Sequence, residues 1–217
     1  MHGEIPFVSY ECMGLLRTYD RLGLRATMNH FSLDHQFSES SAAVADATIR
    51  IIASRGLDAV SVREVARESG FAAGSVQYHA PNKEILLAHA FIRSIQRQTA
   101  RVSRASIPDD EFEAWVVRLS ELLPLGGERL EDAVIWVTYG SASATRDWIA
   151  DLYSQVLDDF QKAVVEVLGD RAEAERKARL ITALVNGLTI DNVRAGEPEA
   201  DRVVGDLRAG LRLILGV

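Results

Sequence analysis

The stretch GSVQYH in the first half of the chain combines small residues with neutral groups that can hydrogen-bond or stack. Gly74 and Ser75 are small, and Gln77, Tyr78 and His79 carry an amide, a phenol and an imidazole. An ordinary exposed helix would carry Glu and Lys, which this stretch lacks. Small residues near a helix start allow close approach to the major groove of DNA, where polar groups can bond to base edges. These residue types favour a DNA-reading surface over the alternative of an exposed helix that merely lacks charge.

Three short helices must position this stretch, and the sequence predicts where each begins and ends. Apolar residues recur with helical spacing over residues 44–52, and Gly56 follows as a helix terminator. Ser61 opens a second helix as the first residue of an S-x-x-E capping box, and a tight glycine turn leads to the third helix. Pro81 prevents the third helix from continuing, and Asn82 caps the helix that follows. Two short helices joined by such a turn form a helix-turn-helix unit.

Residues 44–87 resemble the DNA-binding domain of the TetR family of bacterial transcriptional regulators. The segments ASRGLDAVSVREVARESGF, GSVQYH and PNKEILL occur in the order and spacing of that family. The resemblance implies a homodimer in which the third helix of each chain reads one half of a near-palindromic operator in double-stranded DNA. The family's base contacts correspond here to Ala73, Gly74, Ser75 and Gln77, and its phosphate contacts to Ser61, Tyr78, His79 and Lys83.

Two residues depart from the family's pattern. Ala72 replaces the Ser or Thr that usually caps the third helix, a change that costs about 1 kcal/mol of capping. Ala80 stands where a bulky aromatic residue is common, so the packing beneath Tyr78 and His79 must differ.

The formal net charge of −7 lies away from the proposed DNA-reading segment. Residues 39–97 carry a net charge of +1, residues 1–38 carry −1, and the remainder carries −7. A charge of +1 is a weak electrostatic footprint for a DNA-binding domain. We therefore expect modest nonspecific affinity for DNA. A helical small-molecule-binding module without sequence-specific DNA binding is the alternative function.

Composition and motifs exclude several other classes. The chain shows no nucleophile elbow, phosphate loop or dinucleotide fingerprint, and its five histidines lack metal-ligand spacing. No apolar run approaches the roughly 18 residues that span a membrane, and the first residues do not form a signal-peptide pattern. The single cysteine, Cys12, excludes an internal disulfide and fits a reducing compartment. We expect a cytoplasmic protein that is not an enzyme, with no cofactor, metal site or membrane partner.

The pattern predicts an all-α fold in three parts. Residues 1–38 form an N-terminal extension of unclear role, residues 39–84 the helix-turn-helix DNA-binding domain, and residues 85–217 a helical effector-binding and dimerisation domain. The extension lacks a sustained helical or strand period. Either translation begins at Met28 and leaves a short arm, or a helix near residues 14–24 packs on the body.

Helical periodicity continues through the larger C-terminal part, interrupted by small residues. The sequence PLGG and the segment from Tyr139 to Ala144 are expected breaks between helices. The expected helices span approximately residues 84–104, 112–123, 128–138, 145–168, 172–194 and 199–215.

The last two helices carry small and apolar residues with helical spacing, which favours a four-helix interface with a second copy. Intramolecular packing alone is the other interpretation. The region also resembles the BetI-like C-terminal domains of the TetR family, in the W-x-x-Y stretch at Trp136 and in the sequence LVNGL. The expected interface residues are Ala183, Leu184, Gly187, Leu188, Val203, Leu207, Leu211 and Ile214.

Aromatic residues gathered in the C-terminal domain predict a pocket for a small organic effector, and their ring faces could also bind a cation. Ordinary core packing is the alternative for each of them. The candidates are Phe112, Trp115, Trp136, Tyr139, Trp148 and Tyr153. A ligand beside the long helix that begins near residue 84 would tilt it and change the spacing of the two DNA-reading helices. Repression relieved by such a ligand is the expected mechanism, although the sequence does not distinguish repression from activation.

Overall fold

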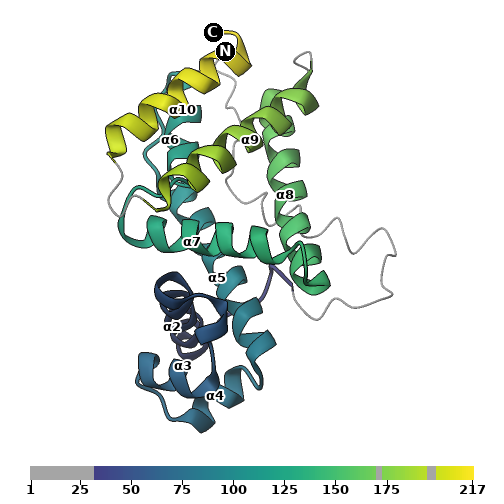
Figure 1. The fold of residues 1–217 in the computed structure, drawn as a ribbon. Helices are drawn as coiled ribbons and strands as arrows, with labels where there is room; N and C mark the ends of the chain where they lie inside the picture. Colours follow the sequence, from purple (N-terminus) through teal and green to yellow (C-terminus); the bar gives the residue numbers. More distant parts are fainter. Residues whose placement is uncertain (1–31, 170–172, 195–198) are drawn as a thin grey trace.

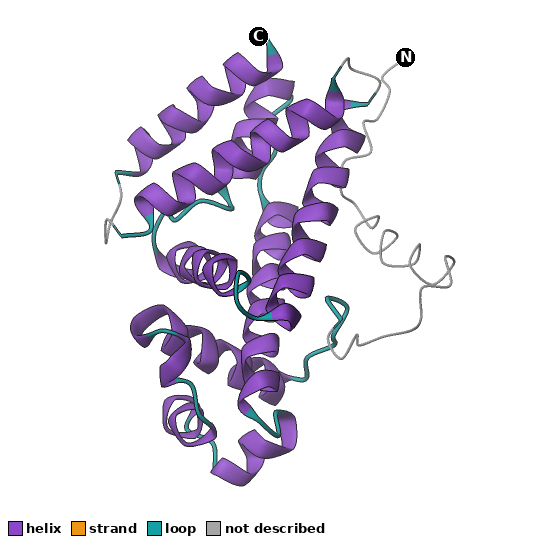
Figure 2. Ribbon diagram, turned by 45° about the vertical axis from the view of Figure 1, so that its right-hand side comes forward, coloured by secondary structure: helices purple, strands orange, loops and turns teal. Residues whose placement is uncertain are grey.

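The computed structural model describes residues 32–169, 173–194 and 199–217. Within these ranges the chain is helical, with one short 3-10 turn and no strand, so the all-α prediction is confirmed (Figure 2). The expectations for a start at Met28 and for a helix at residues 14–24 lie outside the described residues. The α-helices are α2 (Glu39–Arg55), α3 (Val62–Ser69), α4 (Ala73–His79), α5 (Lys83–Arg104), α6 (Glu111–Ser120), α7 (Gly127–Ala142), α8 (Asp147–Leu168), α9 (Ala174–Asn192) and α10 (Ala200–Leu215).

Side-chain caps and glycines set the limits of the first helices, as predicted. The Ser61 Oγ accepts a hydrogen bond from the Glu64 backbone N–H at 3.2 Å, and the Asn82 Oδ1 accepts one from the Ile85 N–H at 2.9 Å. Gly56 and Gly70 end α2 and α3 with φ angles of 79° and 76°, which glycine adopts without steric cost.

Glu64 differs from the predicted capping box in one respect. Its carboxylate accepts hydrogen bonds from Arg55 at 2.7 Å and from Arg67 at 2.9 Å. The bonds from these two guanidinium groups lower the pKa of Glu64 to about 2. The Glu64 carboxylate thus takes part in two ion pairs, of which the pair with Arg55 joins α2 to α3 and the pair with Arg67 lies within α3.

The helix α2 packs on α5, while α3 and α4 pack on α2 and on each other, and together they form the lower end of the molecule in Figure 1. Helices as short as α3 and α4 are marginal in isolation, so they depend on this shared core. The largest apolar side chains of α2 and α5 at this core are buried, as are the few that α3 and α4 contribute. They include Val44, Ile49, Ile51, Ile52, Val65, Val76, Leu86 and Phe91, each at most 1% exposed.

The helix α7 lies across α5 and joins the lower core to the rest of the molecule (Figure 1). Tyr139 on α7 is fully buried, donates a hydrogen bond to the Leu87 carbonyl oxygen at 2.6 Å and stacks on Phe91 at 4.7 Å. Burial raises the pKa of Tyr139, so its hydroxyl stays protonated and serves as a donor. This contact fixes α7 on the helix that leads from the DNA-reading segment.

A second core is built from α6, α8, α9 and α10, at the upper end of Figure 1. Trp115, Leu123 and Ile181 contribute to it and are at most 3% exposed. The helix α10 approaches α9 closely at Gly210, where an added Cβ would lie 2.6 Å from a methyl carbon of Leu184. Glycine is therefore required at this crossing unless Leu184 moves.

A break between helices occurs near the predicted segment Tyr139–Ala144 but begins later, because α7 continues to Ala142 and the turn spans residues 143–146. Gly140 does not interrupt this helix. A Cβ at Gly140 would lie 2.9 Å from the hydroxyl oxygen of Tyr153, so the glycine allows α7 and α8 to pack closely. The helix predicted to reach Leu123 ends at Ser120, and Leu123 is buried in the turn that follows.

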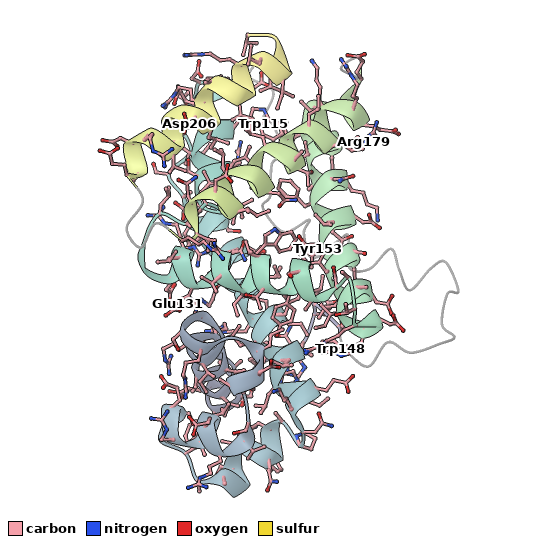
Figure 3. All side chains as sticks on the ribbon, in the orientation of Figure 1. Trp115, Glu131, Trp148, Tyr153, Arg179 and Asp206 are labelled. Carbon is pink, nitrogen blue, oxygen red and sulfur yellow. The ribbon has the colours of Figure 1, made fainter. Side chains whose placement is uncertain are left out.

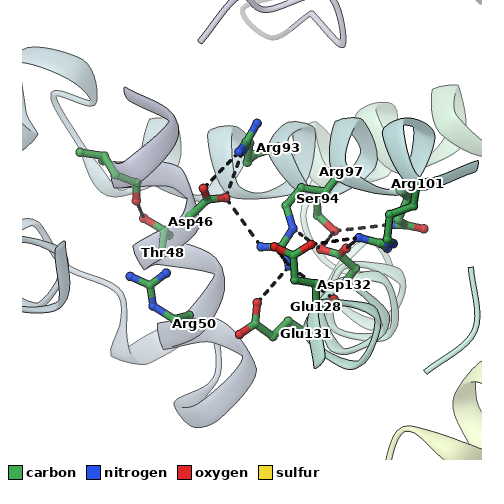
Figure 4. A network of polar contacts seen from close by, with 12 residues as sticks. Asp46, Thr48, Arg50, Arg93, Ser94, Arg97, Arg101, Glu128, Glu131 and Asp132 are labelled. Atoms are coloured by element: carbon green, nitrogen blue, oxygen red, sulfur yellow. Dashed lines mark hydrogen bonds and ion pairs between the residues drawn. The ribbon is translucent and has the colours of Figure 1, made fainter. Parts of the chain in front are cut away.

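A network of charged side chains joins α2, α5 and α7 (Figure 4). The side chain of Arg97 on α5 is 9% exposed and lies 3.6 Å from Asp46 of α2, 3.0 Å from Glu131 and 3.4 Å from Asp132 of α7. Burial opposes its charge, but these carboxylates outweigh the effect and raise the pKa of Arg97. Arg101 adds a second contact to Asp132 at 2.7 Å.

Replacing Asp132 by alanine should lower the free energy of unfolding by about 3–5 kcal/mol, because two partly buried guanidinium groups would lose their shared carboxylate. Urea unfolding followed by circular dichroism measures this change. The matched control is Asp206→Ala, which removes an exposed pair with Arg202 and should change stability by no more than about 0.5 kcal/mol. Equal effects of the two substitutions would contradict the role assigned to the network.

Candidate nucleic-acid interface and effector cavity

The helix α4 presents its small and polar residues to solvent. Gly74, Ser75, Gln77 and Tyr78 are exposed, and Tyr78 is 85% exposed. Val76 lies on the opposite face of the helix and is fully buried. The stretch GSVQYH is therefore a regular helix anchored on the core from one side, at the lower end of the molecule (Figure 1).

The two departures from the family's pattern have clear structural consequences. Ala72 occupies the N-cap position of α4, and its side chain makes no capping hydrogen bond. Ala80 is fully buried at the end of the helix. The neighbouring rings of Tyr78 and His79 pack edge-to-face at 5.2 Å, so the aromatic corner forms without a bulky residue at position 80.

The residues predicted to bind phosphate flank this helix. The exposed Lys83 begins α5, and its Nζ donates a hydrogen bond to the Asp58 carbonyl oxygen at 3.1 Å. Ser61 is half-buried, and its hydroxyl oxygen serves as the cap of α3. Ser40 was missed by sequence reasoning. It borders a shallow hollow of about 350 Å³ together with Phe71, Gly74, Ser75, Tyr78 and His79.

Ion pairs between α2 and α3 neutralise much of the positive charge in this region. Arg50 lies 2.9 Å from Glu68, and Arg55 and Arg67 share Glu64. Surface pairs of this kind reduce the charge available to phosphates. Residues 39–97 thus combine a low net charge with ion pairs that occupy several of their arginines. We therefore expect DNA binding to depend on shape and specific contacts more than on net charge.

A cavity of about 730 Å³ lies between α5, α6, α7, α8, α9, the start of α2 and the segment that precedes α2. Its size suits a drug-sized organic molecule, and its walls are mainly apolar. The apolar walls include Ile95, Leu119, Leu122, Val156, Phe160, Val164 and Val185.

Two of the six predicted pocket aromatics, Trp115 and Trp136, line this cavity. The Trp136 Nε1 donates a hydrogen bond to the Asn186 Oδ1 at 2.9 Å, which orients the indole. Tyr153 contacts the Trp136 ring at 4.3 Å and does not itself line the cavity. Phe160, which also lines the cavity, was missed by sequence reasoning, although its helical spacing from Val156 and Val164 marks the same face of α8.

The other predicted aromatics lie elsewhere, because helical packing distributes them along the molecule (Figure 3). Tyr139 of α7 is buried against α5, as described above. Phe112 packs at the second core beneath the guanidinium of Arg212, at 5.2 Å. Trp148 packs against the first core at the start of α8. The six residues therefore do not form one pocket.

The cavity also contains charged groups of both signs. Burial lowers the pKa of Arg118. Burial raises the pKa of Asp159, and the nearby Lys162 opposes that shift. Both charges are thus partly desolvated, which makes them sensitive to the charge of a bound molecule.

The described residues contain no group of three His, Cys, Asp or Glu side chains that could hold a metal ion. Among the helices in the same ranges, none has the length and apolar character needed to cross a membrane.

Family comparisons agree with this geometry. Residues 44–90 match the family described as bacterial regulatory proteins, tetR family, and residues 115–216 match the BetI-type transcriptional repressor C-terminal domain. The chain belongs to the TetR family. It is a DNA-binding transcriptional regulator with a BetI-like C-terminal domain, as the sequence predicted.

Individual relatives of this TetR-family chain are distant and nearly full-length. The transcriptional regulator PksA of Bacillus subtilis is 24% identical over 79% of this chain and 88% of its own. BetI of Paraburkholderia xenovorans is 26% identical over 70% of this chain and 81% of its own. A transcriptional regulator from Rhodococcus has a TM-score of 0.74 at 28% identity, covering 82% of this chain and 96% of its own. A regulator from Saccharomonospora viridis, solved in complex with choline, has a TM-score of 0.63 at 25% identity. The match covers 80% of this chain and 95% of that regulator.

TetR-family regulators generally bind DNA as dimers, but several predicted interface residues are unsuited to contact a second chain. Val203, Leu207 and Leu211 are 0% exposed because they face α9 and α6 within the protomer. Ala183 and Gly187 are exposed, and Leu184, Leu188 and Ile214 are half-buried. The exposed apolar residues that sequence reasoning missed are Leu180, Ile190 and Leu213, at 43%, 56% and 86%.

Two substitutions should separate base reading from phosphate binding. Gln77→Ala should relax discrimination at one base pair, at a cost of about 1–3 kcal/mol for the preferred operator. Lys83→Ala should weaken binding to all sequences alike and lower the slope of log affinity against log salt by about 1. Fluorescence anisotropy with the operator and its single-base variants, at several salt concentrations, measures both effects. Unchanged discrimination in Gln77→Ala would exclude that residue from base reading.

Proposed function

We propose that this protein is a repressor that binds a near-palindromic operator as a homodimer in the cytoplasm and is released by a small organic effector. The observation that carries this proposal is the position of α4. The helix exposes small and polar residues on one face, while the buried Val76 holds the other face on the core.

The proposed interface for base reading consists of one α4 from each chain. Dimeric helix-turn-helix proteins contact two half-sites about 34–36 Å apart, one helical turn of DNA. Ala73 and Gly74 at the start of α4 allow close approach, and Gln77 offers an amide for a bidentate contact to adenine. Tyr78, His79, Lys83 and Ser61 are proposed to position the helix through the DNA backbone.

The proposed dimer surface is the exposed face of α9 and α10. Leu180, Ala183, Gly187 and Ile190 follow helical spacing along α9, and all four are exposed. Leu213 on α10 is 86% exposed. Paired with the same face of a second copy, these helices would form a four-helix interface with twofold symmetry.

The cavity beside α5 is the proposed effector site. Ile95, Thr99 and Val102 line it from one face of α5, whose other face holds Arg97 and the charged network to α2. A ligand that favours one tilt of α5 would therefore favour one spacing of the two α4 helices. Choline is the first compound to test, because a structural relative is described in complex with it and two tryptophans, Trp115 and Trp136, line the cavity, and indole rings attract cations.

Selection of bound sequences from a random pool of double-stranded DNA tests the proposal as a whole. The expected product is a near-palindrome whose half-sites lie one helical turn apart. Enrichment of a single half-site, or no enrichment at low salt, would contradict a dimeric operator-binding protein.

Leu213→Glu should convert the dimer to a monomer, because it would place a carboxylate of each chain in the proposed apolar interface. Sedimentation velocity measures the oligomeric state. Fluorescence anisotropy should show a lower affinity for the operator in the monomeric variant. Ser154→Glu, which adds the same charge at an exposed position of α8, is the control and should leave the dimer intact. If Leu213→Glu remains dimeric, the interface lies elsewhere.

A further inference from the structure

The segment of residues 32–38, here called the N-terminal strap, crosses α5 immediately before α2 begins. Its side chains alternate in burial. Leu33, His35 and Phe37 are half-buried, whereas Asp34 and Gln36 are exposed. Residues 32–35 form a turn, in which the His35 N–H donates to the Ser32 carbonyl oxygen at 3.0 Å, and the alternation in burial continues from this turn to α2 with one face against the protein. The strap is therefore packed on the body along its length.

A single side chain of α5 holds the backbone of the strap. The Nε2 of Gln96 donates hydrogen bonds to the Leu33 carbonyl oxygen at 3.1 Å and to the His35 carbonyl oxygen at 2.9 Å. Both hydrogens of this amide are thus used on the strap. The internal hydrogen bond of the turn uses the Ser32 carbonyl oxygen and not those of Leu33 and His35, so loss of the Gln96 amide would leave these two carbonyl groups to solvent.

Aromatic contacts hold the second half of the strap. His35 stacks on His89 of α5 with ring centroids 4.4 Å apart, and Phe37 meets the same imidazole edge-on at 5.4 Å. Burial, together with the nearby His35 and His79, lowers the pKa of His89 to about 4. The His89 ring is neutral at neutral pH, so the stack carries no repulsion between two cations.

The strap is also one wall of the large cavity. Its residues from Leu33 to Ser38, with Glu39 of α2, line the same space as Trp136 and Phe160. A molecule that fills this space must touch the strap. The strap ends at Ser38, whose Oγ caps α2 by accepting from the Ser41 N–H at 3.2 Å. Ser40, two residues further, borders the hollow beside α4.

We propose that the N-terminal strap is part of the effector site, so that an apolar or aromatic ligand binds directly against Leu33 and displaces the start of α2. This inference rests on the proposed function of the cavity. It adds a second way in which ligand binding could move the DNA-reading helix α4, through the start of α2 and not through α5. The ligand's shape is then selected in part by residues N-terminal to the helix-turn-helix domain.

Acrylamide quenching of tryptophan tests whether the strap covers the cavity. In a Trp148→Phe background, Trp115 and Trp136 remain as reporters, and both line the cavity. Gln96→Ala should raise the Stern–Volmer constant clearly, because the strap loses its anchor. Gln98 also lines the cavity, but its side-chain amide donates a hydrogen bond to Ser94 and not to the strap. The Stern–Volmer constant of Gln98→Ala should therefore rise much less. Equal constants for the two variants would overturn the proposal.

Binding of the neutral fluorophore N-phenyl-1-naphthylamine tests contact with the strap. Leu33→Ala should weaken its binding up to about tenfold, since an apolar contact is lost. Leu130→Ala, at a half-buried position of α7 away from the cavity, is the control and should not weaken it. Circular dichroism verifies that each variant is folded.

Trp136→Ala separates failure of this inference from failure of the proposed function. If Trp136→Ala weakens fluorophore binding and Leu33→Ala does not, the strap lies outside the ligand site while the cavity remains one. If the fluorophore does not bind, or binds regardless of both substitutions, the proposed effector site in the cavity is wrong and the role proposed for the strap is wrong with it.

Discussion

The structure depends on the burial of one face of two very short helices. The helices α3 and α4 are too short to be stable alone, and each places little more than one apolar side chain fully inside, Val65 and Val76. These side chains reach a core whose larger members belong to α2 and α5. Because the inner face of α4 is held so firmly, its outer face need not contribute to folding. It can carry glycine, serine and tyrosine, which form helices less readily than alanine or leucine, beside the good helix former glutamine.

The long helix α5 connects this arrangement to the rest of the molecule by using its faces differently. Its first half contributes Leu86 and Phe91 to the core beneath α4. Further along, Ile95, Thr99 and Val102 line the cavity, while Arg97 and Arg101 on the opposite face reach the carboxylates of α7. Arg97 also approaches Asp46 of α2. A change in the cavity therefore acts on a helix whose other face holds α2 and α7 through partly buried charges. Such contacts depend strongly on distance, so a small movement of α5 alters them.

Local signals predicted the DNA-binding part well, because caps and glycines act within a few residues. Ser61, Gly70 and Asn82 each mark a boundary that the structure confirms. The C-terminal part depends on contacts between distant segments, and there the same signals misled. Gly140 looked like a break but allows α7 to approach Tyr153, and the close contact of α10 with α9 depends on Gly210, a residue that sequence reasoning did not single out. The cavity was predicted from aromatic residues in general. Periodicity could not show that only Trp115 and Trp136 of that set line the cavity, nor that the strap lines it too.

The central claim is that two copies of α4 are held one helical turn of DNA apart by a symmetric pair of chains. Pulsed electron spin resonance measures this separation directly, with a spin label on Ala72→Cys at the start of α4 in a Cys12→Ser background. With operator DNA bound, the account predicts a single narrow distance consistent with helices about 34–36 Å apart, allowing for the label's tether. Absence of dipolar coupling, or a broad distribution that operator DNA does not narrow, would contradict it.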